Sequence, residues 1–277
     1  GVTIVSSSIQ PTGDQFTITD YQIVNGCQTS NVLYNYKDSE HIARVYIPIK
    51  LIATTDEEVK TSITLATNNQ TPIKKEQLAS LTQFQRSLEQ YYASFPENER
   101  IYYERRSKQF NSDNSIVKAK IITVPYQIKS FAGMFLDEPH NVTSYFGSIV
   151  KRLNDGKIPI FDNEHKYNPY HTSAFAYYKL ESFFRKGLID SSYKKVRFHI
   201  LMLFRHLNSN EVLPQFNSNK IEKYCDKLMD ILIEDDKALE SFKKCIDVID
   251  NSGFNKDDKQ DLKLVSKTKI LLDYIKN

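Results

Sequence analysis

Apolar and polar positions along the chain follow two different periods. Up to residue 52, short runs of β-forming residues are separated by turn residues such as Pro11-Thr12-Gly13-Asp14. These runs predict strands at residues 3–6, 15–19, 21–24 and 45–52. A capping box at Thr55-Asp56-Glu57-Glu58, with apolar residues following at helical spacing, then predicts a helix packed after the strands.

The rest of the chain is predicted to be mainly helical. A long amphipathic stripe covers residues 71–95, and a strand at residues 101–106 places Glu104 and Arg106 on one face and Tyr103 and Arg105 on the other. Beyond about residue 123, helical stripes recur at residues 128–135, 146–153, 173–185, 193–207, 221–233, 239–249 and 262–275. The loop at 154–170 is rich in aromatic residues, which indicates that it packs down.

These patterns predict an α+β fold. We expect a mixed α/β domain with a small sheet at residues 1–125, followed by a mostly α-helical domain at residues 126–277.

The segment Asn25-Gly26-Cys27-Gln28-Thr29-Ser30 follows a predicted buried strand and opens a predicted helix. Asparagine and glycine suit a tight turn, and the amide and hydroxyl groups that follow lie where the first N–H groups of a helix are unpaired. Such a helix start favours an anion, so the segment is a candidate phosphate site. Taken alone, it is also typical of a structural strand-to-helix joint, and a small residue in a tight turn explains Cys27 better than a nucleophile does.

Two further polar clusters, Ala66-Thr67-Asn68-Asn69-Gln70-Thr71 and Tyr103-Glu104-Arg105-Arg106, also lie at the ends of predicted elements. Our hypothesis is that the three clusters converge on one ligand. Asn25, Gly26, Gln28 and Thr29 would then bind phosphate or base edges, and Asn68 and Gln70 would line the opposite wall. Glu104, Arg105 and Arg106 would supply charge. Judged one at a time, the second cluster is better explained as a helix end and the third as a surface ion pair between Glu104 and Arg106.

The same segments carry a resemblance to a known family, the AIPR proteins, named for abortive infection phage resistance. It rests on Gly1-Val2-Thr3-Ile4, on Ile23-Val24-Asn25-Gly26-Cys27-Gln28-Thr29, on Ala66-Thr67-Asn68-Asn69-Gln70, on Tyr103-Glu104-Arg105-Arg106 and on Phe131-Ala132-Gly133-Met134-Phe135-Leu136. The resemblance spans residues 1–178. Gly1 resembles the end of the family's Asn-Asn-Gly motif, so we expect the chain to be a fragment that lacks an upstream part.

The turn at Gly26 is also similar to phosphate-holding turns in ParB-like defence proteins and sulfiredoxins. Those turns carry an arginine where this chain has Thr29. A phosphate clamp here therefore needs a cation from elsewhere, and Arg86, Arg105 and Arg106 are the candidates.

Composition narrows the class of protein without naming a ligand. A formal charge of +3, with 26% charged residues, is ordinary for a globular protein, so charge assigns no partner. The three cysteines, Cys27, Cys225 and Cys245, have no CxxC spacing, which indicates a reducing, cytoplasmic setting without a zinc site, and the last two are expected in the core. No apolar run is long enough to span a membrane. His165 and His171 match no metal-ligand spacing and are expected to be solvated loop residues.

We therefore expect a cytoplasmic, bacterial anti-phage protein with a site for a nucleotide or nucleic acid, and no membrane partner. No motif for a P-loop, a Rossmann fingerprint, a zinc protease or an α/β-hydrolase is present, and the cofactor stays unassigned. One alternative is a nuclease acting on phage or host nucleic acid, with Glu104 and Arg106 as catalytic residues. Another is a noncatalytic sensor that docks a phage protein or a restriction–modification partner. The sequence leaves the trigger and the oligomeric state open.

Overall fold

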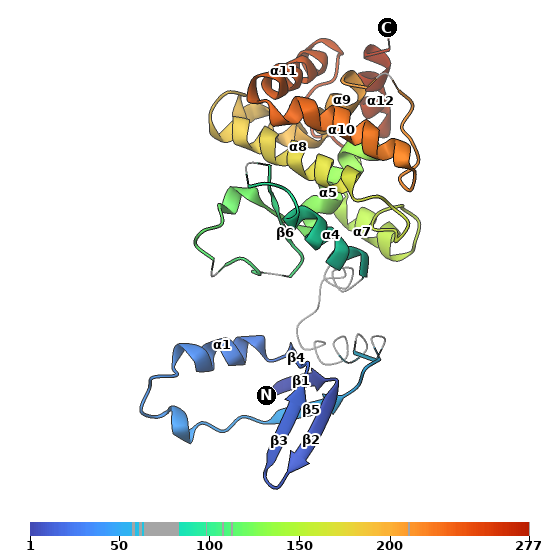
Figure 1. Ribbon diagram of the computed structural model, residues 1–277. Coiled ribbons are helices and arrows are strands. Elements are labelled where there is room, and N and C mark those ends of the chain that lie inside the picture. The colour runs from blue at the N-terminus through green and yellow to red at the C-terminus, as the bar shows by residue number, and fades with distance from the viewer. Residues whose placement is uncertain are drawn as a thin grey trace. The chain divides into compact units, whose positions relative to one another are not determined.

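The computed structural model describes residues 1–56, 59–60, 63, 83–97, 99–106, 108–111, 113–209 and 211–276, and at positions 27, 28 and 154 it describes the backbone alone. The chain divides into two compact units, Gly1–Lys74 and Lys75–Asn277, called unit 1 and unit 2 below (Figure 1). Strands come first and helices dominate afterwards, which confirms the predicted α+β fold. The division into domains at residue 125 stays a prediction.

Unit 1 is built on a three-stranded sheet with the order β4-β1-β5. Strand β1 pairs antiparallel with β4, so that Thr3 lies opposite Asn25, and parallel with β5, so that Val2 lies opposite Ile49. Strands β2 and β3 form a separate antiparallel hairpin. The elements of this unit are β1 (Val2–Ser6), β2 (Ser8–Thr12), β3 (Gln15–Thr19), β4 (Gln22–Asn25), α1 (Cys27–Asn35), the short 3-10 helix η1 (Ile42–Arg44) and β5 (Ile49–Ala53).

The hairpin corrects one sequence prediction. Pro11 and Thr12 were expected in a turn, but they lie in β2, where Pro11 is opposite Phe16. A proline is tolerated there because a two-stranded hairpin has an outer edge on which no N–H is needed. The turn itself begins at Gly13, whose φ of 59° lies in the left-handed region.

Helix formation after β5 is confirmed at Val59, Lys60 and Ile63, the residues described in that segment. The N-terminal cap, however, is Asp56 and not Thr55, because the Asp56 carboxylate accepts a hydrogen bond from the Val59 N–H at 3.2 Å.

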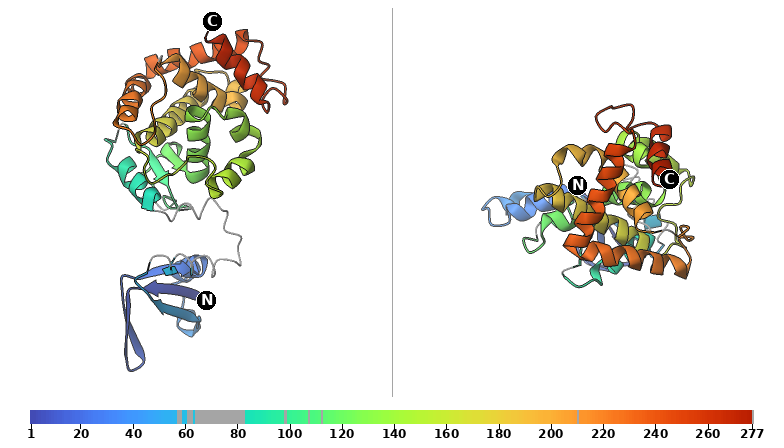
Figure 2. Two further views of the ribbon diagram at one scale, coloured as in Figure 1. Left: turned by 90° about the vertical axis from the view of Figure 1, so that its right-hand side faces the viewer. Right: turned by 90° about the horizontal axis from the view of Figure 1, so that it is seen from above.

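Unit 2 combines a small parallel pair of strands with a helical array (Figures 1 and 2). Helix α5 packs on both α8 and α9, and α10 packs on α8. The elements are α4 (Gln83–Ala93), β6 (Tyr102–Glu104), η2 (Lys118–Lys120), β7 (Ile121–Thr123), α5 (Val124–Phe135), α6 (Pro139–Ser144), α7 (Phe146–Asn154), α8 (Asn168–Arg185), η3 (Ser191–Val196), α9 (Arg197–Leu207), α10 (Asn219–Ile233), α11 (Asp235–Asn251) and α12 (Val265–Tyr274).

One hydrophobic core runs through unit 2 from α4 to α12. Phe131 of α5 is fully buried and stacks on Tyr170 of α8, with 4.3 Å between the ring centroids. The loop before α8 packs against this core through Phe161 and Tyr167, as its aromatic content predicted. Cys225 and Cys245 are buried in the same core, which confirms their predicted place.

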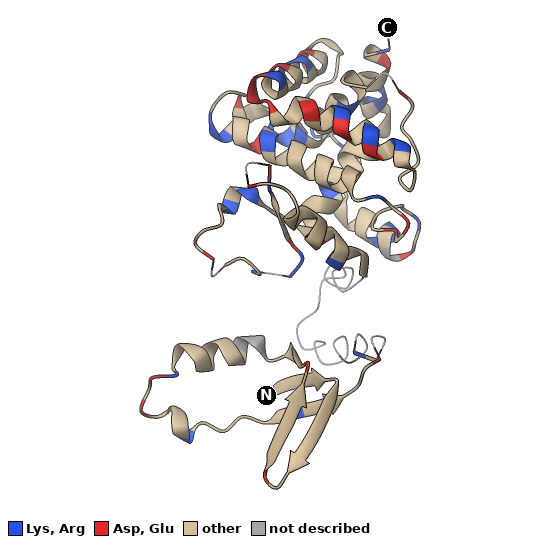
Figure 3. Ribbon diagram, in the orientation of Figure 1, with Lys and Arg blue, Asp and Glu red and all other residues tan. Residues whose placement is uncertain are grey.

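Charged residues are distributed unevenly over the elements (Figure 3). They occur along the outer helices of unit 2, including α10 and α11, whereas the strands β2 and β3 of unit 1 carry no charged residue and are tan. In the part of the chain that the structure describes, no helix is long and apolar enough to cross a membrane.

Candidate functional site

The turn between β4 and α1 is fixed by close backbone packing. Gly26 has a φ of 95°, and a Cβ atom there would lie 2.8 Å from the Gly1 carbonyl oxygen and 2.8 Å from the Val2 Cα. Only glycine meets both demands, because other residues resist a positive φ and a side chain would collide with β1. The strand β1 therefore determines where α1 begins.

The first turn of α1 has features that favour an anion. The N-cap residue, Gly26, has no side chain with which to cap the helix, and the first turn contains no acidic residue. The Ser30 hydroxyl and the Ser30 N–H both donate to the Gly26 carbonyl, at 3.1 Å and 2.9 Å. The first N–H groups of a helix have no acceptor within the helix, so this end offers donors to a negatively charged group.

The predicted ligands of this turn have partly described positions. Asn25, the last residue of β4, and Thr29, in the first turn of α1, are each half-buried. Gln28 lies in α1, but its side chain is outside the described residues, as are Asn68 and Gln70.

The charged cluster Tyr103-Glu104-Arg105-Arg106 lies in unit 2, at the end of β6. Its side chains alternate as predicted: Tyr103 and Arg105 are buried, Glu104 is half-buried and Arg106 is exposed. Tyr103 donates a hydrogen bond to the Gln85 side chain of α4. The inward face of β6 is thereby joined to α4.

Arg105 is held by an ion pair inside unit 2. Its Nε donates to the Glu89 carboxylate at 2.9 Å, and its side chain is 7% exposed. The other oxygen of Glu89 accepts a hydrogen bond from Gln109. A phosphate bound by Arg105 would have to compete with this carboxylate, or reach the guanidinium nitrogens at its far end.

Glu104 and Arg106 are not part of that ion pair. Burial raises the pKa of Glu104 above its usual range, and the nearby backbone of Gln109 and Lys108 acts in the opposite direction. The Arg106 N–H donates to the Gln109 side chain at 3.1 Å. The Arg106 backbone and the Gln109 side chain thus stabilise the turn after β6.

The turn before α1 and the charged cluster after β6 lie in different units. Asn25, Gly26 and Thr29 belong to unit 1, whereas Glu104, Arg105 and Arg106 belong to unit 2. Their convergence on one ligand stays a prediction.

The two histidines expected in solvent are placed differently. His171 lies in α8 and is 1% exposed, and the Nδ1 atom of the half-buried His165 lies 2.9 Å from the Tyr170 hydroxyl. The signal for His171 was present, since Asn168-Pro169 places a proline in the first turn of a helix, where proline is favoured. Among the described residues, no group of three or more His, Cys, Asp or Glu side chains gathers as a metal site.

Comparison with known proteins gives one match. A family model described as AIPR protein matches residues 1–251. No match was found among curated proteins or among solved structures.

Proposed function

Since the chain belongs to the AIPR family, which indicates a role in abortive infection, we propose that it binds a phosphate-bearing ligand, a nucleotide or nucleic acid, during anti-phage defence. The observation that carries the proposal is the start of α1. There a glycine turn leads into a helix N-terminus whose N-cap residue is Gly26 and whose first turn has no acidic residue.

In this proposal the backbone N–H groups at the start of α1 hold a phosphate oxygen, and Asn25, Gln28 and Thr29 add hydrogen bonds to phosphate or base edges. A bound phosphate also needs a cation. We propose Arg106 for this role, because it is exposed, whereas Arg105 already pairs with Glu89. Asn68 and Gln70 complete the predicted site, which would function in the cytoplasm.

Calorimetric titration of the protein with ATP, GTP, and short single-stranded DNA and RNA tests the proposal. We expect one of these probes to bind and Gln28→Ala to weaken its binding about tenfold or more, the effect of losing one hydrogen bond to a charged group. Asn35→Ala is the matched control, because it removes an exposed amide from the other end of the same helix. Absence of binding by all four probes would contradict the proposal.

A coupled pair of variants tests the wider site. If Gln28 and Arg106 hold the same ligand, the combined loss in Gln28→Ala with Arg106→Ala will differ from the sum of the single losses. An unchanged affinity in Arg106→Ala would instead place Arg106 outside the site that contains Gln28. Phage protection that survives Gln28→Ala unchanged would instead favour the sensor alternative.

The nuclease alternative is the second candidate, with Glu104, a half-buried carboxylate at the end of β6, as the catalytic group. Glu104→Gln keeps the size of the side chain and removes the charge. Substrate cleavage that stops in this folded variant would support the alternative, whereas cleavage that continues would exclude Glu104 as the catalytic group.

A further inference from the structure

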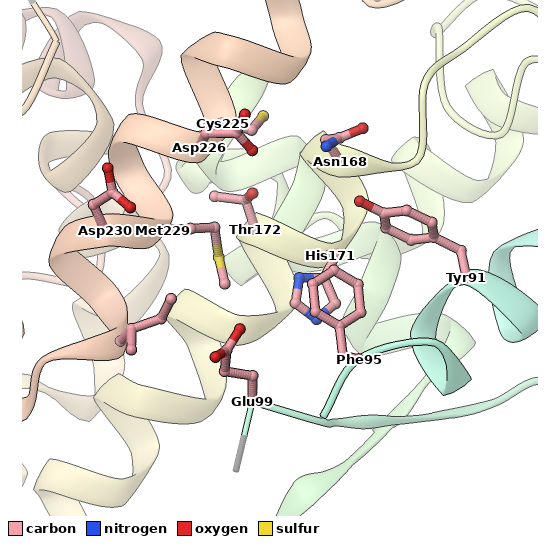
Figure 4. Close-up of a pocket in the computed structure, with 11 residues that line it drawn as sticks. Tyr91, Phe95, Glu99, Asn168, His171, Thr172, Cys225, Asp226, Met229 and Asp230 are labelled. Carbon is pink, nitrogen blue, oxygen red and sulfur yellow. The ribbon is translucent and has the colours of Figure 1, made fainter. Parts of the chain in front are cut away.

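Unit 2 contains a pocket between the first turns of α8 and the outer part of α10, closed by the end of α4 and the loop that follows it (Figure 4). Its volume is about 230 Å³. This is smaller than the usual 300 Å³ or more of pockets for drug-sized ligands, so it suits a side chain or a small molecule and not a nucleotide. The pocket is lined by Tyr91, Phe95, Glu99, Asn168, His171, Thr172, Cys225, Asp226, Met229, Asp230 and Ile233.

The imidazole of His171 forms one wall. Its ring stacks on Phe95, with 3.7 Å between the centroids and an interplanar angle of 3°, and the two rings overlap in Figure 4. Burial lowers the pKa of His171 to about 3, so the ring is neutral near pH 7. Its Nε2 atom is buried and has no hydrogen-bond partner among the described residues.

An unpaired buried nitrogen is costly, because the group loses its hydrogen bond to water on folding and gains none in return. A neutral imidazole whose proton is on Nδ1 offers Nε2 as an acceptor. This nitrogen has no accessible surface, so a cation in the pocket lies against the wall that His171 forms without bonding to Nε2.

The rim of the pocket is acidic. Asp226 and Asp230 lie one turn apart on α10, an arrangement of like charges that destabilises a helix. Neither carboxylate has an ion pair or hydrogen bond within the described part of the chain, and the nearby Lys166 pairs with Glu222 at 3.2 Å. Burial, followed by the charges of Asp230 and Glu222, raises the pKa of Asp226. Figure 4 shows these carboxylates on the α10 side and Glu99 on the opposite side.

We propose that this pocket binds the ammonium or guanidinium end of an alkyl chain. Asp226 and Asp230 pair with the positive charge. Tyr91 and Phe95 pack against the chain and attract the charge through their ring faces.

This site shares no residue with the proposed phosphate site, and its carboxylates repel an anion. The cation can come from a free diamine or from a lysine or arginine of a protein partner. Its chemistry is the same in both cases.

The test is NMR on the protein with ¹³C-labelled histidine. The chain has six histidines, and the His171 signal is identified by its absence in His171→Gln. We expect cadaverine to shift this signal saturably. Pentane-1,5-diol, which has the same chain length without charge, is expected to leave it unchanged.

The carboxylates are tested by isosteric substitution. Asp226→Asn and Asp230→Asn should each weaken cadaverine binding about threefold, and together about tenfold, as expected for partly exposed ion pairs. Asp236→Asn is the matched control, because it removes an exposed carboxylate from the first turn of α11, outside the pocket. It should leave the affinity unchanged.

A capped tripeptide with a central lysine distinguishes the sources of the cation. Tighter binding by the tripeptide assigns the site to a partner's side chain, and tighter binding by cadaverine assigns it to a free amine. The proposal is overturned if neither probe gives a saturable shift at millimolar concentration, if the diol binds as well as the diamine, or if the double aspartate variant binds unchanged. None of these results depends on whether ATP or nucleic acid binds in the separate titrations.

Discussion

Units 1 and 2 are held together in different ways. Among the described hydrophobic residues of unit 1, only Val2, Val5 and Val24 are buried, and large side chains such as Phe16 and Tyr46 are exposed. Unit 2 has a continuous core of aromatic and aliphatic side chains. Unit 1 therefore depends mainly on strand pairing and turn geometry, whereas unit 2 depends on side-chain packing.

This difference predicts which kind of substitution destabilises each unit. Truncating a side chain removes little from unit 1, because most of its described side chains are in contact with water. A change to the backbone conformation acts on the strand pairs directly. In unit 2 we expect truncation of a side chain to have the larger effect, since packed side chains provide most of the stability there.

The largest expected effect is that of Phe131→Ala in unit 2. Phe131 is 0% exposed and stacks on Tyr170, so its removal should lower the free energy of unfolding by about 3–5 kcal/mol. The matched change in unit 1, Phe16→Ala, removes a ring that is 59% exposed and should cost below about 1 kcal/mol. Urea denaturation followed by far-ultraviolet circular dichroism measures both. Equal losses of unfolding free energy in the two variants would contradict the difference between the units.

Much of this contrast was predictable from the sequence. The helical stripes identified α5, α8 and α10 and placed Cys225 in the core, because a period of 3.6 requires one buried face. The alternation in β6 likewise predicted that Tyr103 and Arg105 share a face, and in the fold both residues are buried. Such patterns are local, so a short window of sequence is enough to find them.

Features that depend on distant residues were not predictable. The ion pair between Arg105 and Glu89 joins β6 to α4, and the strand β7 is recognised only by its pairing with β6. The pocket beside His171 combines residues from α4, α8 and α10, and no sequence window contains them together. For the candidate phosphate site, the sequence identified the turn at Gly26, but the contact with Gly1 and Val2 that explains the glycine is visible only in the fold.

Lowering the pH should destabilise unit 2 through its buried histidines. Burial lowers the pKa of His171 and of His199 to about 3. Above the unfolded pKa of about 6.5, both states are neutral and the histidines leave stability unchanged. Between about pH 6.5 and 3, the unfolded state binds more protons, so stability falls as the pH falls. From pH 7 to pH 5 each histidine should remove about 2 kcal/mol from the free energy of unfolding.

Urea denaturation at pH 7, 6 and 5 measures this slope. His199→Leu should make the slope shallower by up to about 1.4 kcal/mol per pH unit, because neither ring nitrogen of His199 has a hydrogen-bond partner among the described residues and one titrating group is removed. The control is His41→Gln in unit 1, where the histidine is exposed and the slope should not change. A slope that is the same in His199→Leu as in the wild type would show that this histidine is protonated in the folded protein.

The smallest expected effect is the difference in stability between alanine variants at two glycines of unit 1. Both have a positive φ, 95° at Gly26 and 59° at Gly13, so alanine is strained at either position by about 1–2 kcal/mol. At Gly13 an added Cβ meets nothing within 4 Å, whereas at Gly26 it meets backbone atoms of Gly1 and Val2 at 2.8 Å. Backbone atoms cannot rotate away, so β1 and α1 must separate in Gly26→Ala.

We therefore expect Gly26→Ala to destabilise unit 1 by about 1 kcal/mol more than Gly13→Ala does, the lower end of the cost of overpacking. Hydrogen exchange of the amides of β1 and β4 measures the difference, which corresponds to about fivefold faster exchange in Gly26→Ala. The amides of α5 in unit 2 provide an internal reference and should exchange alike in both variants. Equal exchange of β1 in the two variants would mean that β1 does not fix the start of α1, and the geometric argument for a preformed anion site at that helix end would lose its basis.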